Sequence, residues 1–567
     1  MDNSLRKWRI THHSNKIGLF DAERQSFINQ SGDVVLSFPY RDCVLEWGMS
    51  SEEVGREEKF FHTTIDRVDI DVLREPKVLT GFEKIDKDWV YTITDADEVE
   101  FFDAEWNLQE NLLIKGNNLI ALYSLRSRLA GKVKLIYIDP PYNTGNDGFR
   151  YNDSFNHSSW LVFMKNRLEI ARELLREDGV MLISCDDNEQ AYLKVLMDEV
   201  FWRENFIANF VWRSSGAGGL RWTFVVKNHE YVLCYCIDAT KHEKWFAPYS
   251  SSSLADFKEE DENGKFKTQA LYLTSLKQTE NQSYFIELPD GTLARPPVWI
   301  WSWRYIEPTF MDELKLWNII FKQTKNSPLI LKNWGQASYN IYTKQYVDPK
   351  WTNPPTWIDE EYVWQTRSSK AMLKNLFDWE NVFDYAKPVS LLSFFFKMLL
   401  QKNDIVLDFC AWSWTIWHAM LDLNKEDGGN RKCILVEQMN YMDTVTIPRL
   451  QKVLQREEIQ TSFIHMELRT YNIEYFERIE SAQTKEDIHT VYVDMAHNAF
   501  LQFWFDRKNW EKDENYQKLT LEDQKIKLRE LLDMNQLYLN TGDIYDARHS
   551  VSRLDQSITE KFYGKKN

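Results

Sequence analysis

Glycine is scarce in this chain. Of its 567 residues only 20 are glycine, whereas 23 are tryptophan. Globular proteins usually contain roughly 7% glycine, so about half of the ordinary glycine content is missing. The two counts together come close to what glycine plus a little tryptophan would normally total. Tryptophan therefore stands in excess by about the amount that glycine is short.

Long apolar runs, paired cysteines and metal-ligand spacings are absent as well. No uncharged apolar stretch reaches about 18 residues, and the N-terminus lacks the apolar segment of a signal peptide, so we predict neither a membrane span nor a secretory signal. The six cysteines form no Cys-x-x-Cys pair, which predicts reduced structural thiols in a cytoplasmic protein. The eleven histidines show no metal-ligand spacing, so we predict no metal site.

Positive charge is also in deficit, because the formal net charge is −17. This balance argues mildly against nucleic-acid binding, since phosphate contacts need Lys and Arg. The acid is concentrated locally, as in Asp95–Glu100 and Asp256–Glu262. A basic cleft can coexist with such acidic faces, so the net charge does not exclude a DNA substrate.

The pattern of strands and helices predicts an α/β fold with several regions. Apolar strands alternate with helices over 111–200 and again over 389–437, which is typical of a parallel sheet with covering helices. The stretch between them is irregular and rich in aromatics, so we predict one sheet assembled from two stretches of chain. The predicted regions are an N-terminal region 1–95, an α/β part 96–204, an insert 205–365, a second α/β part 366–445 and a helical C-terminal region 446–567.

The most informative motif is Asp139-Pro140-Pro141-Tyr142, which follows the apolar run 133–138. An apolar run that ends in an acid and two prolines predicts a buried strand that stops abruptly. In open α/β sheets, ligands bind at the edge formed by the carboxyl ends of the strands, which is where this motif lies. The Asp139 carboxylate and the Pro140 carbonyl could accept hydrogen bonds from the two N–H groups of a nucleobase amine. The Tyr142 ring could stack on a base extracted from the duplex. The alternative interpretation is an ordinary turn.

Several segments resemble the adenine-N6 DNA methyltransferases of the β permutation class, and within them the modification subunits of type III restriction-modification systems. The resemblance implies a Rossmann-like S-adenosylmethionine-dependent sheet from two chain segments, with an inserted target-recognition module and a helical C-terminal region. It implies site-specific methyl transfer to adenine N6 in double-stranded DNA, with Asp139, Pro140, Pro141 and Tyr142 as the catalytic motif. The segments that carry the resemblance are 111–119, 134–145, 383–389, 406–409, 434–438 and 535–539.

The same resemblance implies where S-adenosylmethionine binds. Asp408 would open a loop near the methionine end of the cofactor, and Glu437 would accept hydrogen bonds from the ribose hydroxyls. Lys387 belongs to a cofactor-side motif, and Asn117 would lie near the adenine. The implied loop comprises Phe409, Ala411, Trp412, Ser413, Trp414 and Thr415. The alternatives are an ordinary strand-end acid for Glu437 and a helix N-cap for Asn117, and we interpret His229-Glu230-Tyr231, which also recurs in the family, as structural.

The chain departs from the family in this loop. The family has glycines on both sides of a serine where this chain has Trp412 and Trp414, and a small residue at Trp417. Glycine is needed where backbone approaches a cofactor closely, and indole rings would fill that volume, so the chain as written should bind S-adenosylmethionine poorly. One hypothesis is that UGA codons, read as glycine in the cell, stand here as tryptophan. The other is a genuine pseudoenzyme that keeps a DNA-binding role.

Three competing functions remain open. A cytosine-N4 methyltransferase would share the chemistry. A catalytically impaired homologue would act as a DNA-binding subunit. An α/β enzyme unrelated to DNA would leave the resemblance of the insert and the C-terminal region unexplained. The family further implies a homodimer and a helicase-nuclease restriction subunit as partners, and no membrane.

Overall fold

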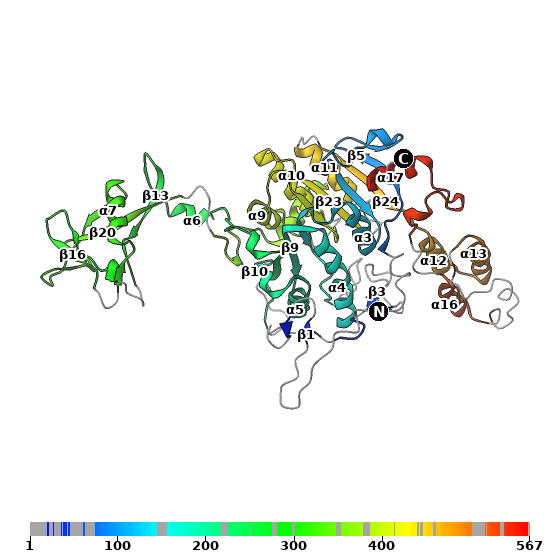
Figure 1. Ribbon diagram of the computed structural model, residues 1–567, viewed down its shortest axis with the longest axis horizontal. Helices are drawn as coiled ribbons and strands as arrows, with labels where there is room; N and C mark the ends of the chain where they lie inside the picture. The colour runs from blue at the N-terminus through cyan, green and yellow to red at the C-terminus, as the bar shows by residue number, and fades with distance from the viewer. Residues whose placement is uncertain are drawn as a thin grey trace, which may run out of the picture. The chain divides into compact units, whose positions relative to one another are not determined.

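The computed structural model shows two compact units (Figure 1). Unit 1 comprises Met1–Trp245 and Pro355–Asn567, and unit 2 comprises Phe246–Pro354. The structure describes residues 20–21, 26–27, 36, 38–41, 43–45, 60–62, 74–144, 156–216, 225–249, 251–274, 280–297, 301–347, 353–377, 386–412, 414–438, 442, 446–457, 461–499, 501, 516, 519–532 and 538–564.

Unit 1 is built on an 11-stranded sheet. Its six central strands are parallel, because each pairs in parallel with its neighbour. Their order is β9 (Leu175–Cys185), β8 (Val133–Ile138), β22 (Ile405–Asp408), β23 (Lys432–Glu437), β7 (Asn111–Lys115) and β24 (Phe463–Leu468). Strand β8 is buried at every position, as its largely apolar sequence predicts.

The edges of this sheet are formed by other strands. On the β9 side lie β11 (Glu230–Cys236), β10 (Phe206–Trp212) and β21 (Trp357–Ile358), and on the β24 side lie β5 (Leu79–Ile85) and β6 (Val90–Thr92). Strands β11 and β5 run antiparallel to their inner neighbours. The sheet therefore extends beyond the predicted parallel core on both sides.

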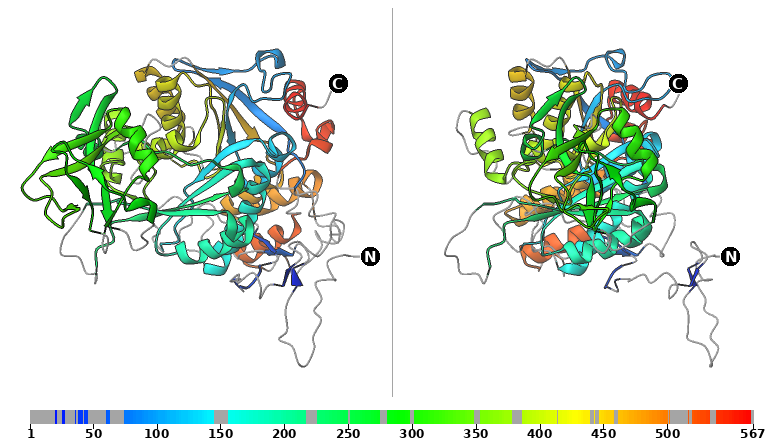
Figure 2. Two further views of the ribbon diagram at one scale, coloured as in Figure 1. Left: turned by 60° about the vertical axis from the view of Figure 1, so that its left-hand side comes forward. Right: turned by 90° about the vertical axis from the view of Figure 1, so that its left-hand side faces the viewer.

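Helices cover both faces of the sheet (Figures 1 and 2). One face carries α3 (Asn118–Leu129), α4 (His157–Leu174) and α5 (Gln190–Phe201), and the other carries α9 (Val389–Leu399), α10 (Thr415–Asp427) and α11 (Ile447–Glu457). The predicted α/β sheet with covering helices is confirmed.

The two stretches of chain interleave at the centre of the sheet. Strand β22, from the second stretch, pairs with β8 from the first, with Leu407 opposite Ile136. Strand β23 pairs with β7, with Glu437 opposite Lys115. The ends of strands that are 270 residues or more apart in sequence thus share one edge of the sheet.

The observed boundaries differ from the predicted regions. Strands β10 and β11 fall within the predicted insert 205–365 yet belong to the main sheet, and unit 2 is the shorter Phe246–Pro354. Likewise β5 and β6 come from the predicted N-terminal region, and β24 comes from the predicted helical C-terminal region. The other described residues of that C-terminal region include the helices α12 (Asn472–Ser481), α13 (Lys485–Asn498), α16 (Leu521–Leu531) and α17 (Arg553–Tyr563).

Unit 2, drawn in green in Figure 1, has its own apolar core of residues such as Leu271, Trp303 and Ile341. Around it are small antiparallel sheets and the helix α7 (Glu307–Lys315). The strands are β12 (Glu259–Asp261), β13 (Gly264–Ala270), β14 (Tyr272–Thr274), β15 (Ile286–Glu287), β16 (Leu293–Arg295), β17 (Trp301–Trp303), β18 (Ile319–Gln323), β19 (Ile330–Leu331) and β20 (Tyr339–Tyr346).

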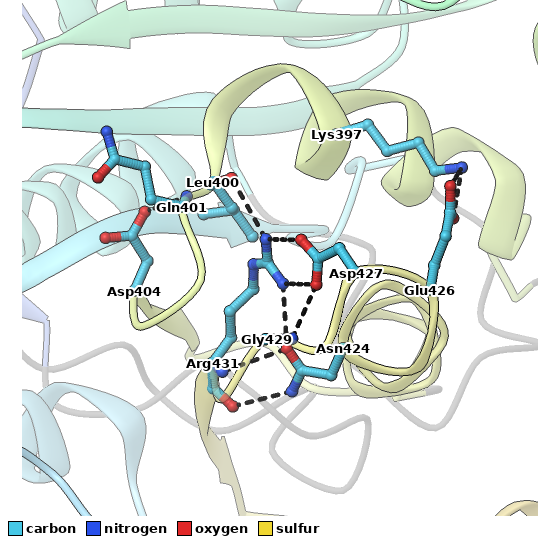
Figure 3. Close-up of polar contacts among 9 residues, drawn as sticks. All are labelled: Lys397, Leu400, Gln401, Asp404, Asn424, Glu426, Asp427, Gly429 and Arg431. Carbon is cyan, nitrogen blue, oxygen red and sulfur yellow. Dashed lines mark hydrogen bonds and ion pairs between the residues drawn. The ribbon is translucent and has the colours of Figure 1, made fainter.

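A buried arginine ties helix α10 to the start of β23 (Figure 3). The Arg431 guanidinium donates to both carboxylate oxygens of Asp427, at 2.9 and 2.7 Å, and to Asn424 at 3.1 Å. The Asn424 side chain also bonds the backbone of Arg431 in both directions, at 3.2 Å each. This contact fixes the C-terminal end of α10, while the N-terminal end of the same helix begins at the opposite edge of the sheet.

Candidate active site

Four of the sequence-predicted side chains meet at the carboxyl edge of the parallel strands. Asp139 follows β8, Asp408 ends β22, Glu437 ends β23 and Asn117 follows β7. Because these strands are neighbours in the sheet, their ends lie side by side. This is the edge where open α/β sheets bind ligands.

Asp139 and Tyr142 are held by a charged cluster. Lys387 Nζ lies 3.0 Å from Asp139 Oδ1 and 3.3 Å from Glu230 Oε2. The Tyr142 hydroxyl donates to the same Glu230 oxygen at 3.1 Å. Lys387 Nζ also lies 4.7 Å from the centroid of the Tyr142 ring, within cation–π range. One lysine thus connects both acids to the aromatic ring.

The cluster sets the protonation of its members. Burial raises the pKa of Asp139, and the charge of Lys387 opposes this rise. Burial disfavours the charge on Lys387, but the neighbouring carboxylates raise its pKa above the ordinary value. Burial, with the charges of Asp139 and Glu230, raises the pKa of Tyr142 well above its usual range. Lys387 therefore stays charged, and Tyr142 stays a hydrogen-bond donor.

The turn after β8 is fixed by two further contacts. The indole N–H of Trp160 in α4 donates to the Pro141 carbonyl at 2.9 Å. Asn143 has a left-handed φ of 59°, and its amide donates to Glu189 at 2.6 Å. These bonds define the direction in which Pro140, Pro141 and Tyr142 leave the strand.

Asp408 and Glu437 are both buried. The carboxylate of Asp408 accepts the Cys410 N–H at 2.8 Å, and that of Glu437 accepts the Gln438 N–H at 2.8 Å. Burial raises the pKa of Asp408 well above its usual range, and the charges of Asp139 and Glu437 raise it further. The edge is therefore rich in carboxylate and would be stabilised by a cationic ligand.

The loop between Asp408 and α10 carries the remaining predicted cofactor residues. Thr415 begins α10, and its hydroxyl donates to the Lys387 carbonyl at 3.1 Å. The Phe409 carbonyl accepts from the Asn118 amide at 2.7 Å, and the Ala411 N–H donates to Val436 at 3.4 Å. Ser413 lies outside the described residues. The loop is thus tied to the Lys387 segment, to α3 and to β23.

Trp414, at the end of the loop, and Trp417, in the first turn of α10, are both buried. The Trp414 and Trp417 rings pack on Phe463 of β24, with centroids 6.2 and 4.8 Å away. Neither of their indole N–H groups finds a hydrogen-bond acceptor in the described part of the chain. A buried donor left unsatisfied costs about 1–3 kcal/mol. Trp412 is partly buried against the main core.

Asn117 acts as a helix cap. Its side chain accepts the N–H groups of Leu119 and Ile120, at 3.0 and 3.5 Å, at the start of α3. The backbone N–H of Asn117 donates to the Tyr538 hydroxyl at 2.9 Å. The capping interpretation of Asn117 therefore describes its side chain in this structure.

Glu230 is the residue at this site that the sequence pattern did not reveal. The sequence predicts a structural role for the His229-Glu230-Tyr231 segment, yet Glu230 contacts both Lys387 and Tyr142. The segment's recurrence in the family was the available signal. Across the residues with described positions, no group of three His, Cys, Asp or Glu side chains forms a metal site. Nor does any helix in those parts have the length and apolarity to cross a membrane.

Comparison with known proteins identifies relatives of this chain. A family model described as DNA methylase matches residues 133–447, more than half of the chain. A protein named as a probable type III restriction-modification enzyme HindVI Mod subunit, from Haemophilus influenzae, is 29% identical over 98% of this chain and 87% of its own length.

Two further likenesses cover less. The type III restriction-modification enzyme StyLTI Mod subunit from Salmonella typhimurium is 32% identical over 59% of this chain, which spans about half (53%) of that protein. The solved structure of the PvuII DNA methyltransferase, described as cytosine-N4-specific, is 12% identical with a TM-score of 0.32, over 61% of this chain and 88% of that one.

Proposed function

Because this chain belongs to the DNA methylase family, we propose that it transfers a methyl group from S-adenosylmethionine to adenine N6 in duplex DNA. The observation that carries the proposal is the meeting of Asp139, after β8, with Asp408 and Glu437, at the ends of β22 and β23. An amine acceptor site and a cofactor site are thereby adjacent on one sheet edge.

Asp139 and Pro140 act on the amine. The lone pair of an exocyclic amine is delocalised into the base, which makes it a poor nucleophile. Acceptors directed at its two N–H bonds draw the nitrogen toward tetrahedral geometry and localise that lone pair. The Asp139 carboxylate and the Pro140 carbonyl are these acceptors, and they need not be strong bases. Tyr142 stacks on the extracted base, a contact worth about 1–3 kcal/mol.

Lys387 and Glu230 position the two groups. Lys387 keeps Asp139 ionised by opposing the pKa rise that burial causes. Glu230 fixes the tyrosine ring by accepting from its hydroxyl. Neither residue is required to touch the base, so both are positioning residues.

The buried carboxylates fit a cationic cofactor with hydroxyl groups. Asp408, Glu437 and the loop Phe409, Ala411, Trp412, Ser413, Trp414 and Thr415 would hold S-adenosylmethionine, together with Lys387 and Asn117. When bound, the cofactor supplies the electrophilic methyl group. The carboxylates at this sheet edge favour binding of the cofactor, whereas the bulky tryptophans of the loop disfavour it.

Unit 2 is proposed as the module that recognises the DNA sequence. It holds 12 Lys and Arg against 12 Asp and Glu, so the whole net charge of −17 belongs to unit 1. A neutral unit repels phosphates less than its strongly acidic neighbour does. A homodimer, a helicase-nuclease restriction subunit and a cytoplasmic location are proposed from the family alone.

The test uses the cells that encode the protein. The gene is deleted, then restored as wild type or as Asp139→Ala, and the modified bases of genomic DNA are mapped. The expected result is N6-methyladenine at one sequence motif that disappears on deletion and returns only with the wild type. Loss of N4-methylcytosine instead would favour the cytosine alternative. No change in any modified base would refute the proposal and favour the impaired DNA-binding homologue.

A further inference from the structure

Tryptophan occupies the left-handed backbone positions of this protein far more often than its abundance explains. The chain has 23 tryptophans in 567 residues. Among the described residues, eight that are not glycine have a positive φ, and five of these are tryptophan. They are Trp106 (64°), Trp202 (69°), Trp317 (59°), Trp334 (66°) and Trp414 (55°). A bulky residue at positive φ is an outlier, whereas glycine adopts it without steric cost.

Trp317 stands at the residue where helices most often place glycine. It follows α7 and its cap Leu316, and its N–H bonds Leu314 at 3.2 Å while the N–H of Asn318 bonds Glu313 at 3.0 Å. These two bonds define a Schellman motif, whose left-handed residue is usually glycine. Elsewhere in the chain α10 and α17 end on Gly428 (67°) and Gly564 (63°).

Trp334 and Trp106 close two short hairpins with the same geometry. The N–H of Trp334 bonds Leu331 at 2.9 Å, and the N–H of Leu331 bonds Gly335 at 2.7 Å. Around Trp106, Asp103 makes the two corresponding bonds, to Trp106 and Asn107, at 3.0 Å each. This is a three-residue hairpin loop in which a type I turn is followed by a left-handed residue, ordinarily glycine.

The other two positions have equally special backbones. Trp202, after α5, combines its positive φ with an extended ψ of 137°, close to a region that only glycine populates. Trp414 caps α10 in the left-handed conformation, and its buried indole lacks an acceptor in the described part of the chain. Three of the five side chains are also strongly exposed, Trp106 at 44%, Trp317 at 83% and Trp334 at 70%.

Other tryptophans of the chain have the environment that indole requires. Trp160 and Trp303 are completely buried. Their N–H groups donate to the carbonyls of Pro141 and Tyr284, at 2.9 and 2.8 Å. Neither has a positive φ. These two positions are fitted to indole, whereas the five positions described above are fitted to glycine.

We propose that the protein made in its own cells carries glycine at positions 106, 202, 317, 334 and 414, because the cell reads a UGA codon as glycine where the written sequence shows tryptophan. The glycine deficit of the chain, 20 residues against 23 tryptophans, has the sign that this substitution produces. Four of the five positions are assigned from backbone geometry away from the cofactor loop, so the proposal does not depend on any function.

Tandem mass spectrometry of the protein isolated from those cells tests the assignment directly. The expected peptides contain glycine at positions 106, 202, 317, 334 and 414, and tryptophan at 160 and 303. The gene is expected to carry UGA at the first five positions and UGG at the other two. Tryptophan in the peptides at these five positions, or UGG codons there, would overturn the proposal.

A stability comparison provides a second test in an ordinary expression host. The full chain is made with tryptophan codons, and again with Trp106→Gly, Trp202→Gly, Trp317→Gly, Trp334→Gly and Trp414→Gly together. Release of the left-handed strain is expected to raise the unfolding temperature by a few degrees. The matched control, Trp160→Gly with Trp303→Gly, is expected to lower it. A lower unfolding temperature in the fivefold variant would count against glycine as the fitted residue.

The consequence for the cofactor loop rests on the proposed function. Calorimetric titration with S-adenosylmethionine compares the chain as written with a Trp412→Gly, Trp414→Gly, Trp417→Gly variant. The glycine loop is expected to bind roughly tenfold tighter or more, since overpacking is relieved. Equal binding would remove the steric argument about the loop. If the native peptides contain glycine but neither chain binds S-adenosylmethionine, the cofactor assignment is refuted. The assignment of glycine to these positions would still stand.

Discussion

Lys387 is shared by two carboxylates, and this sharing decides how Asp139 behaves. A buried acid that lies next to a second acid, with no cation between them, would tend to hold a proton, because burial and like charge both favour the neutral form. A protonated Asp139 could not accept from an amine with both oxygens. The lysine at 3.0 Å lowers the pKa of Asp139 and so favours its ionised form, and the same lysine also contacts Glu230 at 3.3 Å.

The acidic limb of the pH–rate profile should therefore move in opposite directions in two variants. The rate falls as pH falls through the pKa of Asp139, because the ionised form is the acceptor. Lys387→Met removes the charge that lowers this pKa, so the limb moves to higher pH. Glu230→Gln removes a charge that raises it, so the limb moves to lower pH. Shifts of about one pH unit are expected in single-turnover methyl transfer.

A lysine outside the site serves as the control for this experiment. Lys397 pairs with the half-exposed Glu426 at the far end of α10. Lys397→Met should leave the acidic limb unchanged. If Lys387→Met and Glu230→Gln moved the limb the same way, the charge-sharing account of the cluster would be wrong.

Tyr142 allows a separate prediction about the hydroxyl contact. Tyr142→Phe keeps the ring that stacks on the base and removes the hydroxyl, which bonds Glu230 and also lowers the pKa of Asp139. The expected result is a loss of roughly tenfold or less in kcat/KM, since a single hydrogen bond is worth about 1 kcal/mol. Tyr142→Ala should cost more, because stacking is lost as well. Equal rates for the two variants would argue against a stacking role.

At the scale of single residues, the sequence located the strand-end acids and Lys387, by motif and by family resemblance, and missed Glu230. Asp139, Asp408 and Glu437 each end or follow an apolar run, a local signal that needs no knowledge of pairing. Glu230 is the first residue of β11. It reaches the site only because β11 pairs with β9. A contact made through pairing of distant strands leaves no local pattern.

At the scale of elements, the parallel core was predictable and its edges were not. Strands β7, β8 and β9 alternate with α3, α4 and α5, so strand-helix periodicity identifies them. Strands β10, β11, β5 and β6 join the sheet by antiparallel pairing, which no crossover helix announces. Strand β24 follows a charged helix, and its partner β7 lies far from it in the sequence.

The Arg431 contact allows a prediction at the same scale. Arg431→Met removes a buried guanidinium that bonds Asp427, Asn424 and the Leu400 carbonyl. The expected loss in the free energy of unfolding is about 2–3 kcal/mol, measured by urea denaturation. The partly exposed pair between Lys397 of α9 and Glu426 of α10 supplies the comparison, and Lys397→Met should cost less than about 1 kcal/mol. Similar losses for both would mean that the buried contact does not stabilise α10.

At the scale of the whole molecule, the division into units makes deletion of unit 2, the proposed recognition module, a decisive experiment. Unit 2 has its own core, and unit 1 keeps every strand of the main sheet when Phe246–Pro354 is replaced by a flexible linker. This variant should fold and bind S-adenosylmethionine as tightly as its parent, while methylation at the recognition motif is lost. Circular dichroism, calorimetry and mapping of modified bases in the host's DNA provide the three measurements.

The longer deletion 205–365 is the matched control. It removes β10, β11 and β21, which exposes the backbone of β9 as a sheet edge and removes Glu230 from the cluster. An uncovered buried strand promotes aggregation, so this variant should not yield soluble folded protein. If the shorter deletion kept methylation at the original motif, recognition would lie in unit 1. If it failed to fold, the two units would not be independent, and the assignment of recognition to unit 2 would lose its structural basis.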